Sequence, residues 1–181
     1  VKLMAEVIKV IGKNAFVQVF ESTRGMRVGD EAEFEGHMLE VTLGPGMLSR
    51  NYDGLQNDLD KMEGVFLRRG EYTFPLDNDK LWDFKPLAKV GDKVTAGGWL
   101  GEVDENFQPH KIMVPFTFKG EYTVKSLKEA GQYTIGEVIA VLTDETGKDV
   151  EVTMIQRWPV KRAITCYKEK PRPYKLLETG V

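Results

Sequence analysis

Glycine divides this chain into short apolar stretches, and that division constrains the fold more than any other feature of the sequence. There are 18 glycines among 181 residues. A membrane-spanning helix needs about 20 consecutive apolar residues, so we expect no segment to insert into a membrane. Within one stretch Leu39, Val41 and Leu43 alternate with polar residues and end at Gly44-Pro45-Gly46. Alternation at period two is typical of a half-buried strand, so the sequence predicts a mainly β fold.

The first part of the chain is expected to form part of a small β-barrel. Two stretches rich in β-branched and aromatic residues, 7–10 and 15–20, flank Gly12-Lys13-Asn14, which favours a hairpin. Further strands are expected over 32–34 and 39–43. Three or four short strands punctuated by glycine are typical of a small barrel, in which closure removes exposed strand edges.

One short helix is expected after these strands. Asp53 is a suitable N-cap, and Leu55, Leu59 and Met62 recur at spacings of four and three residues, which places them on one helix face. Gly64 is positioned to end the helix. The sequence therefore predicts a short amphipathic helix between β segments.

From residue 65 the pattern returns to β, and we expect an inserted domain over 65–152, flanked by 1–64 and 153–181. Candidate strands lie at 65–67, 72–74, 81–84, 138–142 and 150–154, and the last two flank the polar turn 144–147. Between them, the glycines of 90–103 are placed where tight turns would separate two very short strands. These features predict a β-sandwich or barrel-like domain, followed by an extended, proline-rich tail.

Residues that usually carry chemistry are scarce. Cys166 is the only cysteine, and His37 and His110 are the only histidines. One thiol excludes an intramolecular disulfide, favours a reducing compartment and leaves too few ligands for structural zinc. We expect both histidines in surface loops and the abundant carboxylates on solvated strand faces and turns. Neither G-x-x-x-x-G-K-[ST] nor a strand-to-helix G-x-G-x-x-G occurs, so we predict no catalytic, cofactor-binding or metal-binding residues.

Residues 90–103 resemble the glycine motif of the lipoyl/biotinyl carrier fold, in which a following hairpin displays a modified lysine. Lys111 would be the candidate lysine. Carrier domains place that lysine at a tight turn, in motifs such as Met-Lys-Met, whereas here it stands in Pro109-His110-Lys111-Ile112. The resemblance therefore favours a lipoyl/biotinyl-like fold without carrier chemistry, since folds are reused without their sites. A carrier domain remains the first alternative.

The second alternative is a nucleic-acid-binding β protein. Residues 157–175 contain seven basic residues and one acid, Glu169, whereas the rest of the chain carries 18 basic and 27 acidic residues. A basic strip can bind phosphate groups. Three prolines interrupt this strip, and it has no repeated aromatic platform. A solvated linker, or a strip facing an acidic partner surface, explains it better, so we expect no nucleic-acid partner.

Five blocks of sequence, in order along almost the whole chain, resemble the A subunit of vacuolar/archaeal-type rotary ATPases. They are Leu43–Leu48 continued by Tyr52–Gln56, Phe66–Gly70, His110–Pro115, Met154–Val160, and the final stretch through Arg172-Pro173-Tyr174 to Val181. The resemblance implies an N-terminal barrel piece and linker, formed by 1–64 and 153–181, with the family's bulge, or non-homologous region, inserted at 65–152.

The resemblance also implies that the chain is a non-catalytic fragment of an ATPase or ATP synthase. The family's P-loop is expected after Val181, and one more barrel strand before Val1. The whole subunit would use Mg-ATP and couple its hydrolysis or synthesis to proton or sodium transport. Expected partners are B subunits and stator, or peripheral-stalk, subunits, at the cytoplasmic surface of a membrane without insertion into it. In this chain we expect assembly surfaces and no bound cofactor.

Overall fold

The computed structural model describes residues 1–181 except 65, 67, 168 and 175–181. Within the described part, the chain forms twelve strands and one three-residue 3-10 helix. The strands form two two-stranded sheets, β1-β2 and β12-β3, and two four-stranded sheets, β11-β10-β8-β5 and β7-β6-β4-β9. The predicted mainly β fold is confirmed, and the structure forms it as open sheets.

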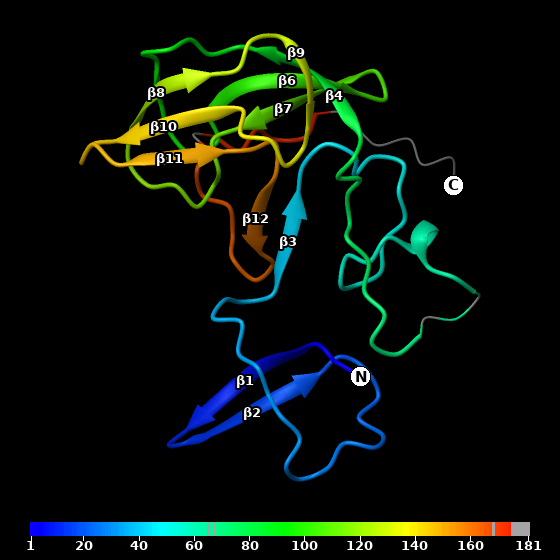
Figure 1. The fold of residues 1–181 in the computed structure, drawn as a ribbon. Coiled ribbons are helices and arrows are strands. Elements are labelled where there is room, and N and C mark those ends of the chain that lie inside the picture. The colour runs from blue at the N-terminus through cyan, green and yellow to red at the C-terminus, as the bar shows by residue number, and fades with distance from the viewer. Residues whose placement is uncertain (65, 67, 168, 175–181) are drawn as a thin grey trace.

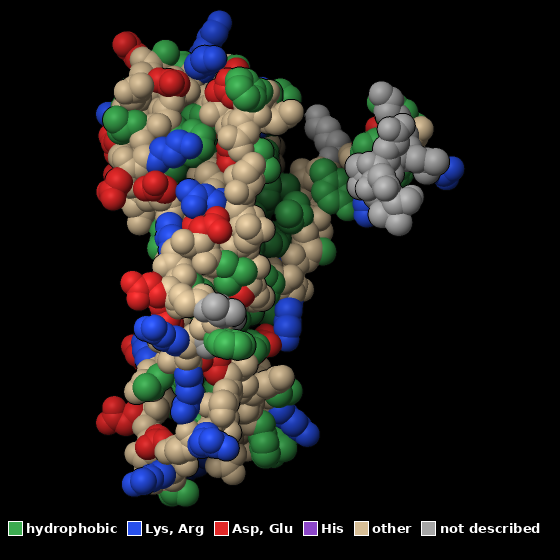
Figure 2. Space-filling view, turned by 90° about the vertical axis from the view of Figure 1, so that its right-hand side faces the viewer, with side chains coloured by type: hydrophobic (Ala, Val, Ile, Leu, Met, Phe, Trp, Pro, Cys, Tyr) green, Lys and Arg blue, Asp and Glu red, His purple; other side chains and the backbone are tan. Residues whose placement is uncertain are grey.

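The elements alternate with loops along the chain (Figure 1). Their bounds are β1 Ala5–Ile11, β2 Asn14–Val19, β3 Glu40–Leu43, the 3-10 helix Leu59–Lys61, β4 Leu81–Pro86, β5 Lys93–Val94, β6 Trp99–Glu105, β7 Gln108–Met113, β8 Tyr122–Leu127, β9 Gly131–Thr134, β10 Ala140–Asp144, β11 Asp149–Val152 and β12 Gln156–Pro159. The β1–β2 hairpin lies at one end of an elongated body and the two four-stranded sheets lie at the other, and Figure 2 shows the same long axis from the side.

The predicted first hairpin is present, and a bulge organises its faces. Strand β1 pairs antiparallel with β2, and the register shifts between Val7 and Lys9. The shift keeps Val7 and Val10 on the same sheet face as their partners Val17 and Ala15. This face is apolar but exposed to solvent, with 42% of Val7 and 65% of Val10 accessible. In the described structure this hairpin is a separate two-stranded sheet, and β3 pairs with β12 and not with the hairpin.

Two of the expected strands are absent, for reasons that the neighbouring segments explain. Residues 32–34 lie between Gly29 and Gly36, both with positive φ, and none of the described strands pairs with them. Residues 72–74 are bonded by side chains instead: the Thr73 N–H donates to the Asn57 amide oxygen over 2.9 Å. Of the expected strand 65–67, residues 65 and 67 lie outside the described part of the chain.

The predicted amphipathic helix from Asp53 to Met62 is wrong. The Asp53 carboxylate accepts hydrogen bonds from the Leu55 and Asn57 backbone N–H groups, both over 2.8 Å, which is the cap that the sequence suggested. Gln56 then adopts a φ of 63°, outside the right-handed helical region, and the chain reverses. Only Leu59–Lys61 forms a single 3-10 turn. The capping interaction was predicted correctly, but it closes a loop.

Burial acts to raise the pKa of the Asp53 carboxyl group, but the hydrogen bonds that it accepts outweigh burial. The Asn57 side-chain amide donates to the second carboxylate oxygen over 2.8 Å, in addition to the two backbone donors. Together these donors hold the pKa of Asp53 below its ordinary value. The loop is therefore fixed by an ionised carboxylate at neutral pH.

The two four-stranded sheets enclose two adjoining apolar clusters. The first cluster comprises Leu76, Trp82, Phe84, Val103, Ile112, Ile135, Ile139 and Met154. The second comprises Leu100, Val114, Val124, Ala140, Leu142 and Val152. Strand β6 supplies Val103 to the first cluster and Leu100 to the second, and Leu127 packs against both. Because each cluster draws on several strands distant in sequence, burial of these side chains holds the two sheets together.

Gly101 allows the close approach of β4 and β6. A Cβ atom at this position would lie 2.2 Å from Cε2 of Phe84 and 2.8 Å from the Lys85 carbonyl oxygen. Both Gly101 and Phe84 are buried, so neither can move towards solvent.

We predict that Gly101→Ala lowers the free energy of unfolding by about 1–3 kcal/mol, the usual cost of overpacking a core. Gly136→Ala is the matched control, because a Cβ there would meet no atom within 4 Å. Denaturant titration of both variants measures the effect. Equal midpoints for the two variants would contradict the close packing of β4 on β6.

Candidate functional site

The described residues hold no group of three or more His, Cys, Asp or Glu side chains arranged to bind a metal ion. His37 lies in an exposed loop, as expected, with its Nδ1 2.9 Å from the Met38 carbonyl oxygen. His110 does not: it lies within β7, and its Nδ1 is 2.7 Å from Oε2 of the buried Glu105. The expectation of two loop histidines was therefore half wrong, because His110 partners an inward-facing carboxylate.

Lys111 has no geometry for carrying a prosthetic group. It lies in the middle of β7, opposite Glu102 of β6, and forms an ion pair with that carboxylate. Its ammonium group is 4.9 Å from the centre of the Trp99 ring. The tight turn of the β6–β7 hairpin holds Asn106 and Phe107 instead. The lysine is thus engaged along a strand and is not displayed at a turn.

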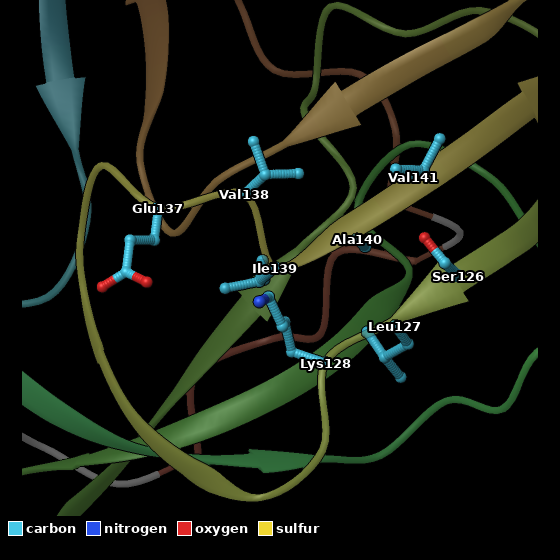
Figure 3. Close-up of a pocket in the computed structure, with 8 residues that line it drawn as sticks. All are labelled: Ser126, Leu127, Lys128, Glu137, Val138, Ile139, Ala140 and Val141. Atoms are coloured by element: carbon cyan, nitrogen blue, oxygen red, sulfur yellow. The ribbon is translucent and has the colours of Figure 1, made fainter.

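A shallow groove of about 480 Å³ lies where β8 leaves β10, but its polar groups do not converge. Figure 3 shows the side chains of Ser126, Lys128 and Glu137 lying apart along this groove. The Glu137 carboxylate already accepts the Thr134 N–H over 2.8 Å. Ligand sites combine apolar walls with a few convergent polar groups, so this groove lacks the second requirement.

The basic residues of 157–175 do not act as one strip where the structure describes them. Arg157 lies in β12, and Lys161 forms an ion pair of 2.8 Å with Glu6 of β1. The carbonyl oxygen of Arg162 accepts the Trp158 indole N–H over 2.8 Å. Lys168 and Lys175 lie outside the described residues. The Lys161–Glu6 ion pair links the chain just after β12 to the N-terminal hairpin.

An organised polar cluster surrounds Glu105, at the end of β6. Glu105 is only 2% exposed. Its Oε1 accepts the backbone N–H groups of Gly46 over 2.7 Å and Leu48 over 2.9 Å, and its Oε2 faces His110. A buried carboxylate is tolerated only when donors surround it. This one joins the 44–48 loop to the β6–β7 hairpin, which lies almost 60 residues further along the chain.

The glycines of the 44–48 loop are required by the same junction. A Cβ on Gly44 would lie 2.7 Å from Cγ2 of Ile155 and 3.2 Å from the Met154 carbonyl oxygen. Gly46 adopts a φ of 104°, which strongly favours glycine. The loop can therefore lie against both β6 and the 154–155 segment only because it lacks side chains at these positions.

Strand β3 is held on both sides next to this loop. It pairs antiparallel with β12, from Leu43 opposite Gln156 to Glu40 opposite Pro159. On the opposite side, the Gln56 side chain acts like a neighbouring strand. Its amide oxygen accepts the Thr42 N–H and its NH₂ group donates to the Thr42 carbonyl, both over 2.7 Å. Three of the recognised blocks, 43–56, 110–115 and 154–160, thus meet at one place, here called the Glu105 junction.

A second polar contact holds the N-terminal hairpin to the rest of the chain. The Glu21 carboxylate accepts the Tyr72 hydroxyl over 2.5 Å and the Gly70 N–H over 2.7 Å. The Tyr72 hydroxyl in turn accepts the Met4 N–H over 2.8 Å. Burial raises the pKa of Tyr72, and the bond to Glu21 raises it further. The recognised block 66–70 therefore ends at a contact with the partial barrel.

Sequence reasoning missed Glu105, which was grouped with solvated carboxylates. One signal was available: Glu105 follows Val103 at the spacing that places both on the inner face of β6. The structure confirms that inward placement. An inward carboxylate at a strand end has to find donors, and the glycine loop supplies them.

Comparison with known protein families assigns the N-terminal hairpin and the four-stranded sheets to two related domain families. Residues 2–36 match the β-barrel domain of the ATP synthase alpha/beta family. Residues 73–161 match the ATP synthase alpha/beta subunit barrel-sandwich domain. The matched ranges contain the β1–β2 hairpin and the two four-stranded sheets, respectively. The fold thus defines a subunit of the ATP synthase alpha/beta class.

Individual relatives narrow this class. The chain is 47% identical over 181 residues to the V-type ATP synthase alpha chain of Treponema denticola, covering 98% of this chain and 31% of that protein. It is 48% identical over 174 residues to the one from Borrelia garinii subsp. bavariensis, covering 94% and 30%. Identity to the Protochlamydia amoebophila protein is 43% over 182 residues, covering 99% and 30%. The chain belongs to the V-type ATP synthase alpha-chain, or A-subunit, family and corresponds to its N-terminal barrel and barrel-sandwich region.

The chain spans less than a third of the length of these curated relatives. Among the described residues, no helix is both long enough and apolar enough to cross a membrane.

We predict that Glu105→Ala destabilises the chain by at least about 2 kcal/mol, because it leaves two backbone N–H groups at the junction without an acceptor. Glu105→Gln keeps an acceptor oxygen and should cost less. Asp104→Ala, at the exposed neighbouring position of β6, is the control and should be nearly neutral. Chemical denaturation ranks the three variants. If Glu105→Ala behaves like Asp104→Ala, the junction is not stabilised by this carboxylate.

Proposed function

We propose that this chain serves as the assembly region of a V-type ATPase A subunit and takes no direct part in its chemistry. The observation that supports this most strongly is that the polar groups of the Glu105 junction form hydrogen bonds within the chain. Each one, from the Glu105 carboxylate to the Gln56 amide, bonds another segment of the same chain. Groups used in this way position segments of the chain relative to one another.

We further propose that residues 65–152 are an inserted domain, the bulge, carried on a framework formed by 1–64 and 153–181. The pairing of β3 with β12 supports this, since it brings the chain before the insertion next to the chain after it. An insertion is tolerated best when its ends lie close together. The first apolar cluster extends across both boundaries by packing against Met47 and Ile155, which would fix the domain on its framework.

The wider setting is proposed from the relatives, which are named V-type ATP synthase alpha chains. In the complete subunit, Mg-ATP hydrolysis or synthesis would be coupled to proton or sodium transport, with B subunits and stator subunits as partners. The assembly would place this region at the cytoplasmic surface of a membrane. In this chain we propose no catalytic, metal or cofactor residues, because it contains no P-loop sequence.

We predict that the isolated chain does not bind Mg-ATP. Affinity for the triphosphate in this class depends on the backbone amides and lysine of a P-loop. Titration calorimetry should therefore show no saturable heat at ligand concentrations up to about 1 mM. Micromolar binding would refute the proposal of a purely structural role.

A further inference from the structure

The turn of the β6–β7 hairpin places an aromatic residue in an unfavourable backbone conformation. Asn106 and Phe107 have φ angles of 52° and 66°, both in the left-handed region. A two-residue turn of this kind favours Asn followed by Gly. A bulky residue there costs about 1–2 kcal/mol of backbone strain. Asparagine is at the expected place, but phenylalanine occupies the position that suits glycine.

The Phe107 side chain gains almost nothing within the chain in return for this strain. It is 96% exposed, whereas the hairpin itself is well ordered by pairing from Glu105 opposite Gln108 to Trp99 opposite Met113. Figure 1 shows the loop between β6 and β7 projecting from the right-hand side of the four-stranded sheets. The surrounding hairpin maintains the strained backbone at Phe107 although the side chain does not contribute to the core. Such strain indicates a function other than folding, such as binding.

The turn is also rigid, because two side chains anchor it to the 44–49 loop. Glu105, immediately before the turn, binds the Gly46 and Leu48 N–H groups. The Asn106 side-chain amide donates to the Ser49 hydroxyl over 3.1 Å, and Ser49 itself has a φ of 62°. Leu48, in the anchored loop, is 48% exposed. The structure thus presents an aromatic and an aliphatic side chain on two loops that are bonded to each other.

We propose that Phe107, supported by Leu48, is an anchor that inserts into an apolar pocket of a partner protein. A rigid aromatic side chain with two rotatable bonds loses little entropy on binding, and such residues dominate the energetics of interfaces. This inference rests on the proposed function, which identifies the partner as another subunit of the assembled ATPase.

The charges at the turn favour a protein over a membrane or a nucleic acid. Residues 104–109 contain one exposed acid, Asp104, and no lysine or arginine, while Glu105 is buried. Anionic lipid surfaces and phosphate backbones attract basic segments and repel acidic ones. Asp104 is exposed beside the turn, so a basic group at the rim of the partner's pocket would complement it.

We predict opposite effects of Phe107→Gly on stability and on assembly. Glycine relieves the strain at this φ and removes no buried contact, so the unfolding midpoint of the chain should stay the same or rise. Binding of the complete subunit carrying the same substitution to the other purified ATPase subunits should weaken by about tenfold or more, as for an interface anchor. Phe107→Trp should bind as the wild type does, because it keeps a large aromatic side chain. Gln108→Ala, at an exposed neighbouring position, should also leave binding unchanged.

The outcomes separate this inference from the proposed function. If the wild-type subunit does not associate with the other subunits, the proposed assembly role fails. If it associates and Phe107→Gly binds equally well, the assembly role stands and the anchor is refuted. A drop in the unfolding midpoint of Phe107→Gly would also refute it, since the side chain would then serve the fold.

Discussion

The burial of one carboxylate, that of Glu105, underlies the arrangement of the other elements. Its side chain is removed from solvent, accepts two backbone N–H groups of the 44–48 loop and lies 2.7 Å from the His110 ring. Leaving a buried carboxyl group without hydrogen-bond partners would cost several kcal/mol, so the loop and the β6–β7 hairpin have to fold together. The loop follows β3, and β3 pairs with β12. The junction therefore lies where the chain enters the four-stranded sheets and where it leaves them.

The Glu105 junction brings together recognised sequence blocks that are widely spaced along the chain. A glycine at 44 and another at 46 permit close backbone approach, and Gln56 completes the free side of β3. Three of the blocks, 43–56, 110–115 and 154–160, contribute backbone shape or a hydrogen-bonding group to this junction. This arrangement agrees with membership of a family in which the same barrel and barrel-sandwich domains recur.

Much of the fold could be predicted from the sequence, because period-two patterns and glycine turns act locally. The β1–β2 hairpin and the β10–β11 hairpin follow from such patterns and are present. The predictions that failed concern segments whose conformation depends on contacts between residues distant in sequence. Asp53 was recognised as a cap, but whether it begins a helix or closes a loop depends on Gln56 reaching β3. The candidate site was missed for the same reason, since the donors to Glu105 lie almost 60 residues away in sequence.

Native-state hydrogen exchange of the Gly46 and Leu48 amides tests the role of the Glu105 junction most directly. Both amides lie in a loop without secondary structure, where exchange would ordinarily be fast. If the carboxylate of Glu105 fixes this loop, both should exchange only when the chain unfolds globally, at the same free energy as core amides such as that of Leu142. Exchange of Gly46 and Leu48 at the rate of exposed loop amides, with the core still protected, would contradict the central role of the junction.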